Sequence, residues 1–183
     1  MLLVGGHNLE EKLKLVKPNV ILKNEYLNML SEWKMYGGEI IPWSLNLDTT
    51  DFISLVDKLN AYSDGINLPD AFVPSTTYWL INKEERVLGA IEIRHKLNDN
   101  LAFRGGHIGY GVRPSERRQG FASKMLSLAL HQCKSIDLSK VLITCSKNNI
   151  GSAKTIMKNG GILDSEDVDD GEIFQRYWID LNI

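Results

Sequence analysis

Residues 109–122 read Gly-Tyr-Gly-Val-Arg-Pro-Ser-Glu-Arg-Arg-Gln-Gly-Phe-Ala, and this stretch decides how the rest of the chain is interpreted. It begins within residues 107–112, a short run typical of a strand. It ends where apolar residues start to recur at i, i+3, i+4 and i+7, as on one face of a helix. The basic turn between them leaves the first N–H groups of that helix without intrahelical partners. Because helix N-termini carry about half a positive charge and bind phosphate, the stretch predicts a site for a phosphorylated ligand.

The residue types in this turn suit a phosphate group. Gly120 lets the backbone come close to phosphate oxygens, and the small Ala122 leaves the first helical turn unobstructed. Arg113, Arg117 and Arg118 would attract the anion over a longer range. An alternative stays open on composition alone, in which the arginines form a solvated loop and the glycine merely permits a turn.

Two common phosphate-binding motifs do not fit the sequence. A P-loop requires Gly-Lys followed by Ser or Thr, and the chain holds no such triplet. The dinucleotide fingerprint G-x-G-x-x-G begins at Gly109 but meets Pro114 where its third glycine belongs. Both motifs are excluded.

Periodic segments on either side of the turn predict an α/β (α+β) domain with layered helices and a mixed sheet. One helix follows Pro18 and ends at Gly37, and a second is preceded by residues 48–50, which can cap it. No linker or internal repeat divides the chain, so residues 1–183 are predicted to form a single domain. The expected strands are 12–16, 76–81, 87–95, 107–112, 141–145, 162–165 and 172–179, and the expected helices cover 26–36, 52–59, 122–133 and 152–158.

Composition and charge limit the partners and the location. The net charge of −2 gives no positive field for a nucleic-acid backbone, so no nucleic-acid partner is expected. No apolar run approaches the ~20 residues that cross a bilayer, and residues 1–11 lack the pattern of a secretory signal, which predicts a cytoplasmic protein without a membrane partner. Cys133 and Cys145 stand in apolar company and are predicted to be free, buried thiols. The histidines and cysteines show no metal-ligand spacing, so no metal is expected.

Two motifs carry a resemblance to a known family. Residues 117–122, Arg-Arg-Gln-Gly-Phe-Ala, resemble the (Q/R)-x-x-G-x-(G/A) signature of the GNAT superfamily of acyl-CoA-dependent N-acetyltransferases. Asn149, followed by a helix that ends at Gly160, is similar to the second signature of that family. The element order matches from about residue 12 to the C-terminus, and residues 105–122 resemble a bacterial subgroup of predicted acetyltransferases.

The resemblance implies a mostly antiparallel mixed sheet flanked by helices, in which two central parallel strands, 107–112 and 141–145, splay apart around acyl-CoA. The amides of residues 118–123 would hold the pyrophosphate, while Val112 and Asn149 would lie along the pantetheine arm. Glycines within the first of these strands indicate a bulge or close approach of the ligand. The cofactor-binding residues implied are Val112, Arg117, Arg118, Gln119, Gly120, Phe121, Ala122, Ser123 and Asn149.

The activity implied is transfer of an acetyl group from acetyl-CoA, as co-substrate, to a primary amine of a small molecule or peptide by direct attack. A competing interpretation is a non-catalytic acyl-CoA-binding sensor or interaction module of the same fold. A third, of another class, is an unrelated phosphate-binding regulatory module. Small acetyltransferases of this kind often pair, so a homodimer is possible.

The sequence departs from the family in its catalytic residues. Ile156 stands where many relatives carry a proton-donating tyrosine, and residues 105–106 are glycines where a glutamate base is often found. Tyr110, Glu92 and His107 are the candidate replacements, because they lie on strands that should border the cleft. Water could instead take the proton of the amine while strand amides polarise the thioester, and these alternatives stay open.

The acidic segment 164–172 does not match a calcium-binding loop, because Val168 and Tyr177 fall at ligand positions. A solvated hairpin loop is expected there. By resemblance it overhangs the acceptor entrance, and we hypothesise that it favours cationic amines by electrostatic focusing.

Overall fold

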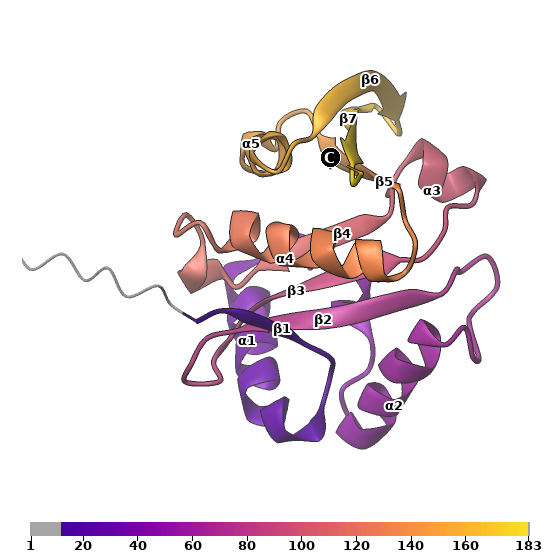
Figure 1. Ribbon diagram of the computed structural model, residues 1–183. Helices are drawn as coiled ribbons and strands as arrows, with labels where there is room; N and C mark the ends of the chain where they lie inside the picture. Colours follow the sequence, from indigo (N-terminus) through magenta and orange to yellow (C-terminus); the bar gives the residue numbers. More distant parts are fainter. Residues whose placement is uncertain (1–11, 183) are drawn as a thin grey trace, which may run out of the picture.

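Two antiparallel sheets meet in the computed structural model of the chain, which describes residues 12–182 (Figure 1). The first sheet has the strand order β1-β2-β3-β4, and the second has the order β5-β7-β6. The strands are β1 (Lys14–Val16), β2 (Ser75–Ile81), β3 (Val87–Arg94), β4 (Ile108–Val112), β5 (Lys140–Ser146), β6 (Ile162–Asp169) and β7 (Glu172–Asp180).

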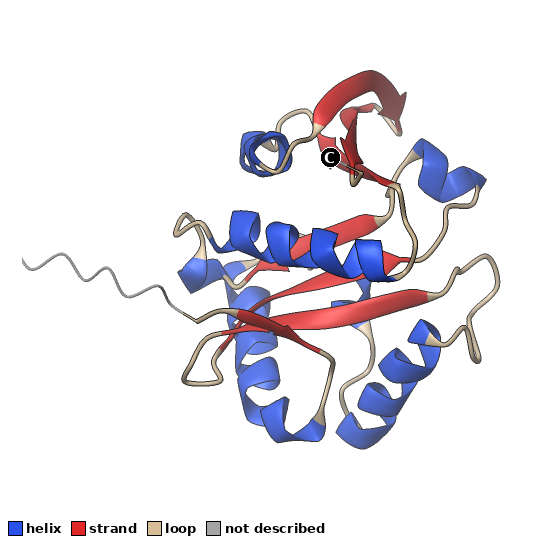
Figure 2. Ribbon diagram, in the orientation of Figure 1, coloured by secondary structure: helices blue, strands red, loops and turns tan. Residues whose placement is uncertain are grey.

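Helices cover both faces of the first sheet (Figure 2). Helices α1 and α2 lie on one face and α4 on the other, with α5 beside α4 and the second sheet (Figure 1). Three short 3-10 turns, η1, η2 and η3, complete the connections. The bounds are α1 (Lys23–Tyr36), α2 (Phe52–Ser63), α3 (Asp99–Phe103), α4 (Phe121–Ser135), α5 (Ile150–Lys158), η1 (Val20–Leu22), η2 (Trp43–Asn46) and η3 (Pro114–Glu116).

A hydrophobic core forms on each side of the first sheet. On one side, Tyr26 of α1 packs against Trp79 of β2, with their ring centroids 4.5 Å apart. Both side chains are fully buried. On the other side Met125 and Leu126 of α4 pack with Ile91 of β3. Burying each such side chain contributes roughly 1.5–3 kcal/mol, so the two cores hold α1, α2 and α4 against the sheet.

The expected strands and helices are present, and the fold class is confirmed. The sequence did not predict α3, a five-residue helix that Asn98 caps by accepting a hydrogen bond from the Leu101 N–H at 3.0 Å. The prediction that residues 48–50 cap α2 was also wrong. Asp51 accepts from the N–H groups of Ile53 and Ser54, both at 3.1 Å, whereas Asp48 bonds to Thr50 instead.

The acidic segment is a strand rather than a loop, which corrects the expectation. β6 continues to Asp169, and only Asp170 and Gly171 form the hairpin turn. Alternate residues 165, 167 and 169 are half-buried, because their polar side chains meet arginines of neighbouring elements. The charge of the segment therefore forms ion pairs and does not prevent strand formation.

β4 contains no bulge, which corrects another expectation. Its pairing with β3 runs without a register shift from Gly89 opposite Val112 to Ile93 opposite Ile108. Gly111 is required for packing and not for a ligand, since a Cβ there would lie 2.3 Å from the Ile41 carbonyl oxygen and 2.4 Å from the Trp33 ring.

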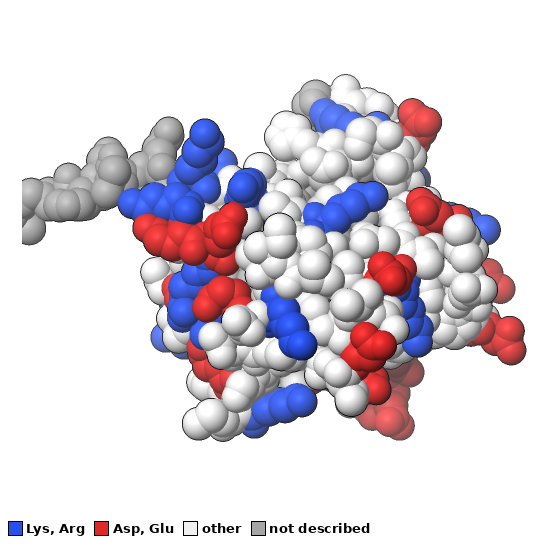
Figure 3. All heavy atoms as spheres, turned by 90° about the horizontal axis from the view of Figure 1, so that it is seen from below, with Lys and Arg blue, Asp and Glu red and all other residues white. Residues whose placement is uncertain are grey.

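Both cysteines, Cys133 and Cys145, are free and buried, as predicted. None of the helices in residues 12–182 has the length and apolar character needed to span a bilayer. Residues 1–11, on which the prediction of location partly rests, lie outside the described part of the chain. On the face drawn in Figure 3, acidic and basic side chains are interspersed.

Candidate active site

The outer edge of β4 presents free backbone groups to the gap between the two sheets. Arg113 N–H donates to Leu88 O at 2.8 Å, and Arg94 N–H donates to His107 O at 2.7 Å. Residues 107 and 113 are therefore hydrogen-bonded to β3, and every second residue between them is hydrogen-bonded to β3 as well. The alternation directs the N–H and C=O groups of residues 108, 110 and 112 away from β3, toward β5. Val112 O on this edge accepts from Arg117 Nε at 3.1 Å, and the remaining backbone groups of the edge are available to a ligand.

β4 and β5 touch at one end only. His107 N–H donates to Leu142 O at 2.7 Å, and Gly106 forms an isolated bridge with Ile143. Further along both strands, Tyr110 and Cys145 line the same cavity, and no backbone ladder joins β4 to β5 there, so the two strands separate. The resemblance implied a separation of two central strands at this place.

A cavity of about 660 Å³ opens at this gap. One wall is the loop between α1 and η2, and the others come from β4, β5, the start of α5 and the segment after α3. The lining residues are Gly38–Trp43, Asn46, Arg94, Arg104, Gly105, Ile108–Tyr110, Thr144–Ser146, Asn149, Ser152 and Glu172.

The turn before α4 has the geometry of an anion site. Gly120 and Arg118 adopt left-handed backbone conformations, with φ of 85° and 63°. Within residues 12–182, the backbone N–H groups of residues 118–123 have no hydrogen-bond acceptor. A Cβ added to Gly120 would meet nothing within 4 Å, so this backbone faces open space. The turn lies beyond Val112, at the far end of β4 from Ile108.

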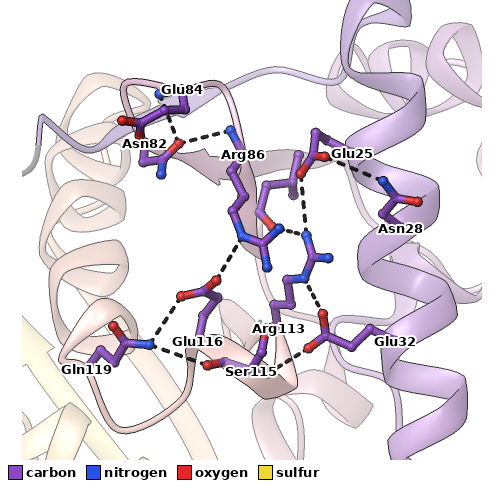
Figure 4. A network of polar contacts seen from close by, with 11 residues as sticks. Glu25, Asn28, Glu32, Asn82, Glu84, Arg86, Arg113, Ser115, Glu116 and Gln119 are labelled. Carbon is purple, nitrogen blue, oxygen red and sulfur yellow. Dashed lines mark hydrogen bonds and ion pairs between the residues drawn. The ribbon is translucent and has the colours of Figure 1, made fainter.

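The arginines of the turn have different roles, which corrects the expectation for Arg113. Its buried guanidinium is paired with two carboxylates of α1: Nε lies 2.5 Å from Glu32 Oε2, and Nη1 lies 3.4 Å from Glu25 Oε2 (Figure 4). Arg117 donates from Nε to Val112 O at 3.1 Å, and its guanidinium lies over the Tyr36 ring of α1 at 4.8 Å. Arg118 alone of the three is exposed.

Glu32 ties the turn to α1. Its second oxygen accepts from the Ser115 N–H at 2.6 Å, so one carboxylate holds both Arg113 and η3 (Figure 4). Burial alone would raise the pKa of Glu32, but the hydrogen bonds from Arg113 and Ser115 lower it below the ordinary value. On the other side of the turn, Glu116 accepts from Arg86 Nε at 2.8 Å and from Gln119 Nε2 at 3.2 Å.

Tyr110 lies where the sequence placed it, in the cavity wall. Its hydroxyl lies 2.9 Å from Ser152 Oγ, at the start of α5, and burial raises the pKa of Tyr110 to about 12. The phenol is therefore protonated at neutral pH and has a proton to donate. Asn149 also lines the cavity, and its side chain caps α5 by accepting from the Ser152 N–H at 3.0 Å.

His107 does not line the cavity, which argues against it as a base. Its Nδ1 accepts from the buried Leu142 N–H at 2.9 Å, and its ring packs against the edge of Trp178. Burial, followed by the charge of Arg94, lowers the pKa of His107 to about 4. The neutral ring joins β4 to β5 and is a structural residue.

Glu92 lies beside the cavity but not in its wall. It pairs across the ladder with Gly109, is 5% exposed, and accepts from Ser75 Oγ at 3.0 Å and Arg94 Nη2 at 3.2 Å. Arg94 is among the cavity residues that sequence reasoning missed, although strand alternation places it on the same face as Glu92.

The acidic charges of the β6–β7 hairpin are mostly paired, which weakens the hypothesis that they attract cations. Arg104 binds Asp169 at 2.9 Å and also contacts Glu172. Of the segment 164–172, only Glu172 lines the cavity, and its pKa is lowered by hydrogen bonds, first from Ser146 and then from Arg104. Within residues 12–182, no group of three His, Cys, Asp or Glu side chains is placed to hold a metal ion.

Comparison with protein families matches residues 22–162 to the family described as the acetyltransferase (GNAT) domain. No curated protein matches the sequence. Among solved structures, the microcin C7 self-immunity acetyltransferase MccE, in complex with acetyl-CoA and AMP, is similar with a TM-score of 0.68 and 13% identity over 93% of each chain.

Two further structures share the fold. An acetyltransferase of Salmonella typhimurium that modifies the N-terminal serine of a 50S ribosomal subunit protein has a TM-score of 0.64 and 13% identity, covering 92% of this chain and 94% of that chain. A mutant of spermidine N-acetyltransferase SpeG from Vibrio cholerae has a TM-score of 0.60 and 13% identity, with the same coverages of 92% and 94%. At these identities the likeness shows the fold.

Proposed function

The chain belongs to the acetyltransferase (GNAT) domain family and is an acyltransferase, and we propose that it moves an acetyl group from acetyl-CoA to a primary amine by direct attack. One observation carries the proposal. The N–H groups of residues 118–123 have no acceptor within residues 12–182, and the turn that carries them follows the end of β4 at Val112. Unsatisfied donors at a helix N-terminus favour a pyrophosphate.

The proposed position of the donor follows from this anion site. With the diphosphate of CoA at Gly120, the pantetheine arm would run along the free edge of β4, where the Val112 N–H points into the gap. The thioester would then lie beside Tyr110, near Asn149 in the cavity wall. Acetyl-CoA is one of the two ligands of the MccE complex, which supports the choice of donor.

The proposed reaction uses few side chains. The amine nitrogen attacks the thioester carbonyl carbon, and the backbone N–H of Tyr110 stabilises the oxyanion that forms. The C–S bond then breaks, and the Tyr110 hydroxyl, reprotonated through Ser152, gives its proton to the thiolate. The attacking amine loses its proton to water, because neither His107 nor Glu92 lines the cavity.

The acceptor enters from the side of the α1–η2 loop in this proposal. Glu39 lines the cavity on that route and has no ion-pair partner within residues 12–182, so its carboxylate favours a cationic amine. Titration calorimetry with CoA, followed by assay of acetyl transfer to a panel of primary amines with detection of free thiol, tests the proposal. Absence of any heat with CoA or acetyl-CoA would refute the donor site. Binding without transfer to any amine would favour the acyl-CoA-binding module instead. A homodimer and a cytoplasmic location stay predictions.

A further inference from the structure

A second, smaller pocket adjoins the cavity. Trp43 and Arg94 line both of them. The volume of the second pocket is about 240 Å³. Pockets that hold whole small ligands measure about 300–1,000 Å³, so this one has room for one group of a larger ligand.

The walls of the second pocket are largely apolar. Trp43 and Phe72 meet edge to face with their ring centroids 4.7 Å apart, and each remains 40% exposed. Ala71, Val73 and Leu101 are the other apolar residues that line the pocket. An exposed aromatic pair beside a concave apolar surface favours contact with another apolar or aromatic group.

The polar floor of the pocket carries no net charge. The Glu92 carboxylate and the Arg94 guanidinium are 3.2 Å apart and 6% and 16% exposed, and Ser75 satisfies the second carboxylate oxygen. Asn98 is also engaged, because it donates to Ala71 O at 2.8 Å and accepts from the Leu101 N–H. A charged group entering the pocket would lose its water and find no unpaired counter-charge.

The pocket opens close to the proposed reaction centre. Glu92 stands opposite Gly109 on the neighbouring strand, and a Cβ on Gly109 would lie 3.6 Å from Arg94 Nη2. Gly109 precedes Tyr110, beside which the thioester is proposed to lie. The absence of a side chain at Gly109 therefore leaves space between the reacting amine and the second pocket.

We infer that this pocket is the acceptor-specificity subsite, and that it takes an uncharged aromatic or branched apolar group carried by the amine substrate. The inference rests on the proposed function, because it assumes that an amine is acetylated beside Tyr110. It assigns the cationic amine to the cavity and the apolar group to the second pocket.

Matched amino-acid amides test the inference kinetically, since they share one reacting amine and differ in side chain. Phenylalaninamide should exceed glycinamide in kcat/KM by about tenfold or more, the preference typical of burying an aromatic group. Lysinamide, which would bring a charge into the pocket, should not exceed phenylalaninamide. Equal values for phenylalaninamide and glycinamide would overturn the subsite while leaving the proposed function intact.

Two variants of α3 locate the effect. Asn100 is exposed and lines the pocket, so Asn100→Trp should fill it and remove most of the preference for phenylalaninamide. Ala102 is exposed on the same helix outside both pocket linings, so Ala102→Trp is the matched control and should keep the preference. Loss of the preference in both variants, or in neither, would contradict the assignment.

A binding measurement decides the subsite without turnover. Benzyl alcohol, a neutral aromatic probe, should shift the methyl NMR signals of Val73 and Leu101 in the wild type and in Ala102→Trp, but not in Asn100→Trp. Unshifted signals in the wild type would overturn the subsite. If no amine is acetylated but these shifts appear, the proposed function fails and the apolar subsite stands.

Discussion

Replacing Glu32 by glutamine should destabilise the protein by about 1.5–3 kcal/mol, because it removes the main counter-charge of a buried arginine. The Arg113 side chain is 7% exposed, and its Nε lies 2.5 Å from Glu32. Breaking a fully buried pair costs about 3–5 kcal/mol. The lower range applies here, since Arg113 keeps Glu25 at 3.4 Å and Val87 O at 3.4 Å, and Glu32 is itself 27% exposed.

Urea and thermal unfolding of Glu32→Gln and of a control provide the assay. In a chain of this size each kcal/mol corresponds to about 2–4 °C in Tm, so a fall of roughly 3–12 °C is expected. Glu84 pairs with Lys83 at 3.4 Å, but both side chains are more than half exposed, and Glu84→Gln should change stability by less than about 0.5 kcal/mol.

The pH dependence gives an independent check. The pKa of Glu32 is lower in the folded protein than in the unfolded chain, where it is about 4.3. The contribution of Glu32 to the free energy of unfolding is therefore present above about pH 4.3 and is lost as the pH falls through the folded-state pKa. The difference in the free energy of unfolding between the wild type and Glu32→Gln should therefore become smaller as the pH falls below about 4.3. If Glu32→Gln matches the wild type at pH 7, the proposed role of the pair with Arg113 is refuted.

Three further predictions concern the anion site, the acid and the buried histidine. Gly120→Asp should weaken CoA binding at least tenfold, about 1.4 kcal/mol, as measured by calorimetry. The control Gly171→Asp changes another left-handed glycine that faces open space (φ 80°), and it should leave the affinity for CoA unchanged. Equal affinities of the two variants for CoA would contradict the site. Tyr110→Phe should lower kcat by about 10²-fold or more while CoA affinity stays the same, and an unchanged kcat would exclude Tyr110 as the acid. Burial lowers the pKa of His107 in the folded protein to about 4, so the unfolded chain takes up this proton at a higher pH than the folded protein does. The free energy of unfolding should therefore fall as the pH drops from about 6.5 toward 4, by up to about 1.4 kcal/mol per pH unit. His107→Asn should reduce this dependence on pH, and the same dependence in the variant and the wild type would show that the His107 ring titrates normally.

Local patterns were enough to place most elements and the turn at Gly120. Helical and strand periodicities depend on neighbours in sequence, and the turn at Gly120 was predicted from the strand and the helix that flank it. The resemblance to the family, and not a local pattern, led to the predictions that Tyr110 borders the cleft and that Asn149 begins a helix. The sequence did not predict α3, whose five residues are too few for a periodic signal.

The roles of individual charged residues needed the tertiary structure. Arg113 and Arg118 look alike in one basic run, yet one is buried against Glu32, far away in the sequence, and the other is exposed. His107 and Glu92 were candidates because strands carry them, but hydrogen bonds from Leu142 and Arg94 occupy them.

Sequence alone therefore determined the family, the order of elements and the position of the proposed phosphate turn, because these follow from local backbone preferences and short spacings. Tertiary structure decided which charges are neutralised, why Gly111 has no side chain, and that a second pocket lies beside Arg94. Burial, hydrogen bonding and electrostatic pairing depend on contacts between residues distant in the chain, which no local pattern specifies.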